Sequence, residues 1–179
     1  MKSLYCIGMI GIMYLMSGCF SNEPTPPSVQ NEIEKICNEA KYTITLGQIS
    51  DIGHNVLSKQ DFKVILDKAL RDSGCFVIES KLSNPEKGYV LNIEYGLEVK
   101  ESKKDTSAIS TQSSAALKSE VRFVMNRTHY TITQNASSTM KMSGKKYLGI
   151  GETPQVTQEQ KERLIQRALK TIFTNLLKI

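Results

Sequence analysis

Residues 89–100, with the sequence YVLNIEYGLEVK, alternate apolar and polar side chains with a period of two. This period predicts a β-strand with one face in a core and the other in water. A turn at 84–88, with the sequence NPEKG, precedes it. The core face would hold Tyr89, Leu91, Ile93, Tyr95, Leu97 and Val99, and the water face Asn92, Glu94, Glu98 and Lys100.

Further strands are expected on both sides of this one. Alternation over 42–49 and the apolar run 75–78 predict two strands before it. Alternation over 117–125 predicts one after it, followed by a turn near Asn126–Arg127. The pattern over 130–142 fits either one long return strand or two short ones.

Two main helices are expected, together with a shorter one at 29–41. In the first main helix, Ser58 would cap the N-terminus and Gly74 would end the helix. In the second, Thr157 and Gln160 form a capping box, and an apolar stripe continues from it to the C-terminus.

This order of elements predicts an α+β fold with a mixed sheet of about four or five strands. The two main helices would pack on one face and leave the other partly open. The stretch SKKDTSAISTQSS, residues 102–114, has little capacity to bury surface, so we expect a mobile loop there. Residues 144–154, rich in Gly and Lys, are expected to form a connector.

Composition restricts the function. The net charge of +5 permits an anionic partner but is too diffuse to indicate nucleic acid. Two histidines leave little material for a His-rich metal site, and the common hydrolase, zinc-protease and phosphate-loop motifs are absent from the sequence. Asp51 and His54 lack an accompanying nucleophile. We therefore expect no catalytic residues, no metal, no cofactor and no enzyme activity.

The N-terminus has the layout of a secretory signal. Lys2 supplies the positive charge, and an apolar run from Leu4 to Met16 is too short to span a bilayer. The segment Met16-Ser17-Gly18-Cys19 resembles the bacterial lipobox, which implies cleavage before Cys19 and lipidation of its thiol. Phe20 follows, and the absence of Asp at this position implies export to the outer membrane in enterobacteria.

The expected domains are therefore a cleaved lipoprotein signal peptide at 1–18, a lipidated Cys and Pro-rich tether at 19–28, and a single periplasmic α+β domain at 29–179. The lipid on Cys19 would hold the domain at the periplasmic face of the outer membrane. Soluble secretion after cleavage nearby is the alternative.

Cys37 and Cys75 are the cysteines that remain for the folded domain in an oxidising periplasm. We expect a disulfide between them, closing a loop of about 39 residues and stabilising the fold by about 4 kcal/mol. Two separate buried thiols are the alternative.

Two features could bind a partner. Basic residues gather in or beside the central hairpin and could engage lipid A phosphates or another anionic envelope component. A solvated face, partly cancelled by Glu98, Glu101 and Glu120, is the alternative. The Ser/Thr loop could order on a protein partner or remain a disordered hairpin tip. The basic set is Lys100, Lys103, Lys104, Lys118, Arg122 and Arg127, followed by Lys141, Lys145 and Lys146.

The order of elements over 42–178 resembles that of the lipopolysaccharide-assembly lipoprotein family, although Phe20-Ser21 replaces that family's Gly-aromatic pair. Residues 62–79, FKVILDKALRDSGCFVIE, look like the helix and strand shared by penicillin-binding-protein activator and curli-secretion lipoproteins. These resemblances imply a non-enzymatic adaptor that docks on an envelope complex. A lipid- or glycan-binding module using the open sheet face is the alternative.

Overall fold

The computed structural model describes residues 33–179 except 54–55, 108–109, 148–150 and 152–153. The predicted signal peptide, Cys19 and the tether lie outside the described residues. The elements are β1 (Tyr42–Asp51), α1 (Lys59–Ser73), β2 (Phe76–Ile78), β3 (Tyr89–Ser107), β4 (Ser110–Arg127), β5 (Tyr130–Tyr147) and α2 (Gln158–Leu176).

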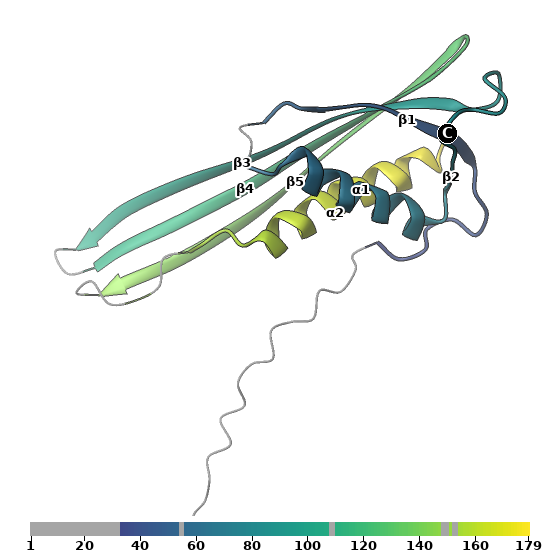
Figure 1. Ribbon diagram of the computed structural model, residues 1–179. Helices are drawn as coiled ribbons and strands as arrows, with labels where there is room; N and C mark the ends of the chain where they lie inside the picture. Colours follow the sequence, from purple (N-terminus) through teal and green to yellow (C-terminus); the bar gives the residue numbers. More distant parts are fainter. Residues whose placement is uncertain (1–32, 54–55, 108–109, 148–150, 152–153) are drawn as a thin grey trace, which may run out of the picture. The chain divides into compact units, whose positions relative to one another are not determined.

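The five strands form one mixed sheet in the order β2-β1-β3-β4-β5. β1 pairs in parallel with both β2 and β3, whereas β3, β4 and β5 form an antiparallel meander. Both helices lie on one face of the sheet (Figure 1). The predicted α+β fold, a mixed sheet of about four or five strands with two main helices on one face, is confirmed, and the sheet has five strands.

The core lies between the sheet and the two helices. From Tyr89 to Val99, every second residue of β3 points into it, and Leu91, Ile93 and Tyr95 are almost completely buried. Tyr95 stacks on Phe62 of α1 with ring centroids 3.9 Å apart. The α2 ring of Phe173 packs edge-on against Phe76 and against Phe123 of β4. The alternation read from the sequence therefore defines the face that packs against the helices.

Both helices begin and end at the predicted residues or close to them. The side chain of Ser58 accepts a hydrogen bond from the Asp61 N–H at 3.1 Å, and Gly74 ends α1 with φ of 69°. At α2, Thr157 and Gln160 form both hydrogen bonds of the capping box. Each cap satisfies backbone groups that the helix itself leaves unpaired.

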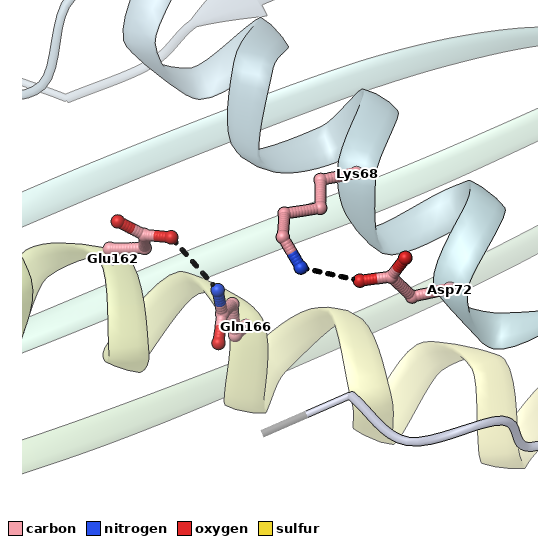
Figure 2. Close-up of polar contacts among 4 residues, drawn as sticks. All are labelled: Lys68, Asp72, Glu162 and Gln166. Atoms are coloured by element: carbon pink, nitrogen blue, oxygen red, sulfur yellow. Dashed lines mark hydrogen bonds and ion pairs between the residues drawn. The ribbon is translucent and has the colours of Figure 1, made fainter. Parts of the chain in front are cut away.

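The facing sides of α1 and α2 carry polar pairs (Figure 2). Lys68 donates to Asp72 at 2.6 Å within α1, and the Gln166 amide donates to Glu162 at 3.0 Å within α2. Both pairs are spaced i, i+4, so each joins neighbouring side chains on one helix face. Gln166 is buried, and its bond to Glu162 offsets the cost of removing the amide from water.

The short helix predicted at 29–41 is wrong over its described part, because residues 33–41 are irregular. The backbone N–H groups of Ile36 and Cys37 both donate to the Ser73 carbonyl at 2.9 Å. That of Lys41 donates to the Cys75 carbonyl, also at 2.9 Å. These long-range hydrogen bonds replace the local ones of a helix, while Cys37 still points into the core.

The predicted disulfide between Cys37 and Cys75 is present, with their Cα atoms 4.9 Å apart. It fixes the segment before β1 to the end of α1, where Gly74 closely approaches the Cys37 carbonyl.

The mobile loop predicted at 102–114 is also wrong, because β3 continues to Ser107 and β4 begins at Ser110. This hairpin extends past the N-terminal end of α2 (Figure 1). β4 is paired on both sides there, so its backbone groups are satisfied without a periodic apolar pattern.

Three neighbouring boundaries also differ from prediction. The turn near Asn126–Arg127 falls instead at Thr128 and His129. The return segment is one long strand rather than two, and β5 takes in the first residues of the connector expected at 144–154. Of the described helices, neither is long and apolar enough to cross a membrane.

Candidate binding surface

The sheet face away from the helices, here called the open face, is the candidate binding surface. Because side chains alternate along a strand, the buried residues of β3 and β4 place their neighbours on this face. It carries Asn92, Glu94, Glu98, Lys100 and Lys104 from β3, Gln112, Ser114, Ala116, Lys118, Glu120 and Arg122 from β4, and Thr133, Asn135, Ser137, Thr139, Lys141 and Lys145 from β5. It is thus polar, rich in small side chains, and charged.

The middle of the open face holds ion pairs. Arg122 lies opposite Glu94 in the register of β3 and β4, and Nη1 is 3.3 Å from the carboxylate. Lys100 lies 3.3 Å from Glu98 on the same strand. Lys118 pairs with Glu120, and this hydrogen bond, with the charge of the carboxylate, raises the pKa of Lys118. These exposed pairs contribute little to stability, but they offset the positive charge of the middle region.

Positive charge remains uncompensated nearer the end of the hairpin. Lys104, Lys141 and Lys145 form no ion pair with any residue whose side chain the structure describes. The register brings them close together: Lys100, Ala116 and Lys141 form one row across the sheet, and Lys104, Gln112 and Lys145 form another. Two rows of lysine side chains separated by small or neutral residues form a surface suited to anionic groups.

The predicted basic set is split between the two faces of the sheet. Lys100, Lys104, Lys118 and Arg122 share the open face, whereas Lys103 and Arg127 belong to the opposite alternation. The Arg127 guanidinium lies 5.0 Å from the Tyr89 ring and 5.7 Å from the Tyr130 ring. Arg127 therefore participates in cation–π contacts at the end of the sheet. Of the lysines that follow in sequence, Lys141 and Lys145 join the open face and Lys146 does not.

Sequence reasoning missed Ile52, which follows β1 and is 57% exposed. Its N–H donates to the Tyr95 carbonyl at 2.7 Å, so the chain stays beside β3 for one more residue. A Cβ on Gly96 would lie 3.2 Å from the Ile52 side chain, so the missing side chain makes room for it. Ile52 contributes to a shallow hollow of about 320 Å³, which is also lined by Glu94, Arg122, Asn135 and Ser137.

A single Ile at the end of a strand does not indicate a binding surface in the sequence, because exposed apolar residues are common. The Gly at position 96 is the feature that could have pointed to a close approach.

The described residues contain no group of three or more His, Cys, Asp or Glu side chains arranged to hold a metal ion. Of the pair Asp51 and His54, the Asp51 carboxylate accepts a hydrogen bond from the Gly53 N–H at 2.7 Å. His54 lies outside the described residues.

No model of a protein family matches the sequence. No curated protein matches it. Among solved structures it is similar to a protein from Helicobacter pylori described as a homolog of the neuraminyllactose-binding hemagglutinin, with 10% identity and a TM-score of 0.45 over 83% of this chain and 89% of that one.

Two other similar structures are lipoproteins by name. A minor lipoprotein from Acinetobacter baumannii has 16% identity and a TM-score of 0.33 over 76% of this chain and 89% of that one. The rare lipoprotein B from Shewanella oneidensis has 8% identity and a TM-score of 0.35 over 75% and 94%. At TM-scores below 0.5, these similarities establish neither a common family nor a shared function.

Proposed function

We propose that this chain is a lipid-anchored envelope protein without catalytic activity, which acts as an adaptor by docking a protein partner on its open face. One observation carries the proposal: the helices cover one face of the sheet, and no helix or strand of the described chain covers the other face of β3, β4 and β5 (Figure 1). The disulfide supports an oxidising compartment. The lipobox resemblance at Met16–Cys19 supports attachment to the outer membrane at its periplasmic face.

The anchor is tested by substitution of Cys19. In the Cys19→Ala variant the protein should leave the membrane fraction, because the thiol that accepts the lipid is gone. A variant that stays in the membrane fraction would contradict lipid anchoring.

Docking is tested with a photo-crosslinking residue placed at one position of the full chain in intact cells. Ser114 is exposed on the open face between the two lysine rows, and Lys63 is a matched exposed position on α1. We expect one defined protein adduct from position 114 and none from 63. The adduct should disappear when Ala116, beside position 114, is replaced by Trp and the thermal unfolding midpoint is unchanged. No adduct at 114, or equal adducts at both positions, would contradict the adaptor function.

The uncompensated lysines favour a second candidate, a module that binds a phosphorylated lipid or glycan. Its probe is a soluble disaccharide diphosphate titrated into the full chain in neutral micelles. Replacing Lys104, Lys141 and Lys145 together by Gln should weaken binding about tenfold, because three charge-assisted hydrogen bonds are lost. As a control, Lys59, Lys63 and Lys178, which are also exposed, are replaced together by Gln. This variant has the same net charge and should bind the probe as the parent chain does. Equal loss in both variants would show only nonspecific attraction.

A further inference from the structure

β5 is an edge strand, and most of its outer side is uncovered by the described chain. It lies last in the strand order, and its pairing with β4 runs from Tyr130 to Tyr147 without a register shift. Near its end, Gly151 lies against the Lys145 carbonyl. From Tyr130 to Met140, no described residue outside β4 forms a backbone hydrogen bond with it.

The register identifies the backbone groups on the outer side. Arg127 and Tyr130 pair across the two-residue turn of Thr128 and His129, so they form a hydrogen-bonded pair. Hydrogen-bonded and non-hydrogen-bonded pairs then alternate along the ladder. The outward N–H and C=O groups therefore belong to the odd-numbered positions Thr131, Thr133, Asn135, Ser137 and Thr139.

This edge lacks the features that usually prevent strands from pairing between molecules. Residues 130–140, YTITQNASSTM, contain no charge, no Pro and no Gly, and β5 has no bulge. Natural edge strands are commonly protected by charged residues, by Pro, by bulges or by being short. β2, at the other edge of the sheet, is only three residues long. The long, uncharged edge of β5 is therefore available for pairing.

We propose that a second copy of this chain pairs with β5 in antiparallel orientation, joining two sheets into one, with Asn135 opposite Asn135 of the second copy. The pairing then spans Tyr130 to Met140 of each copy, so no charged residue of β5 enters it.

The side chains also match in this register. Tyr130 is 48% exposed and shares the helix side of β5 with Met140, which is partly buried. The pairing places Tyr130 opposite Met140 of the second copy, so both would lose exposed apolar surface. On the open face, Thr131 lies opposite Thr139 and Thr133 opposite Ser137, and such hydroxyl pairs are favourable across strands.

Cysteine crosslinking in membranes containing the full chain tests the register. In Asn135→Cys, the new thiol lies opposite its own copy with Cα atoms about 5.5 Å apart, within disulfide reach. In Thr131→Cys, on the same strand and face, the two copies of the thiol are about 27 Å apart. We expect a disulfide-linked dimer for Asn135→Cys and none above the parent level for Thr131→Cys. The unsubstituted parent chain is the control, because it gives the level of any dimer that forms through Cys6 or Cys19. Absence of the Asn135→Cys dimer, or equal dimers at both positions, would overturn the proposal.

A pair of variants with opposite charges distinguishes pairing with a second copy of this chain from pairing with a different protein. Asn135→Lys and Asn135→Asp should each lose the dimer in detergent, because either places like charges opposite each other. An equimolar mixture of the two should recover it, because the opposite charges then face each other. Unchanged thermal unfolding midpoints would show that both variants fold. Dimers that survive both substitutions, or a mixture that stays monomeric, would refute pairing through β5.

Discussion

Replacing Cys37 and Cys75 together by Ala measures how strongly the disulfide holds the segment before β1. The bridged residues are 38 apart in sequence, and for a closed loop of this length the chain-entropy relation gives about 4 kcal/mol of stabilisation. The surrounding backbone hydrogen bonds to Ser73 and Cys75 do not depend on the sulfur atoms. We therefore expect the variant to fold to the same structure with a lower free energy of unfolding.

The assay is urea unfolding of the full chain in detergent, monitored by the circular dichroism of the helices. A loss of about 4 kcal/mol corresponds to a melting midpoint lower by about 8–16 °C for a domain of this size. Dithiothreitol should destabilise the parent chain by a similar amount and leave the double variant unchanged. A loss under about 1 kcal/mol would refute the loop-closure reasoning. A response of the double variant to dithiothreitol would show that the reductant acts elsewhere.

Three further substitutions test the fold. Gly74→Ala should lower the free energy of unfolding by more than about 1 kcal/mol, because φ of Gly74 is 69° and a Cβ there would lie 2.7 Å from the Cys37 carbonyl oxygen. Urea unfolding measures this loss, and an unchanged midpoint would contradict it. Tyr95→Phe removes a 3.2 Å hydrogen bond to the Leu57 carbonyl and should cost about 1 kcal/mol at pH 8. Burial, and to a smaller extent the nearby acidic groups, raises the pKa of Tyr95, so above pH 10 its phenol stays protonated in the folded chain but ionises in the unfolded chain. The free energy of unfolding of the parent chain should therefore fall faster above pH 10 than that of the variant. Parallel pH profiles of the two proteins would contradict this. Leu169→Ala empties a fully buried position of α2 and should cost about 2–5 kcal/mol by the same urea assay, with a smaller loss showing that the core collapses around the site.

The elements predicted correctly are those whose local pattern and tertiary environment agree. In residues 89–99 of β3 and in α2, one face is buried, so the apolar period is visible in the sequence. The strands at 102–114 cannot be recognised from the sequence, because both faces of this stretch are largely polar and its strands are specified by pairing rather than by burial. The segment 33–41 has the apolar spacing of a helix but forms none, because hydrogen bonds to distant carbonyls hold its apolar residues in the core.

The open face was only partly predictable for a similar reason. Alternation shows which residues of one strand share a face, and this placed Lys100 with Glu98. It cannot show which residues of a second strand lie beside them, because register is set by pairing. The neighbouring positions of Lys100 and Lys141 on either side of Ala116 depend on that register. Lys103 and Arg127 are separated from the other basic residues by alternation within β3 and β4.

The place of β1 in the sheet has a consequence for how the chain folds. β3, β4 and β5 follow one another along the sequence as hairpins and can pair through contacts between near neighbours in the chain. β1 lies between β2 and β3, and its partners are about 34 and 45 residues further along the chain, as in Tyr42 with Phe76 and Ile44 with Tyr89. We expect the meander to form first and to provide the edge onto which β1 adds later. β1, the first strand of the described chain, would thus be among the last to take its place.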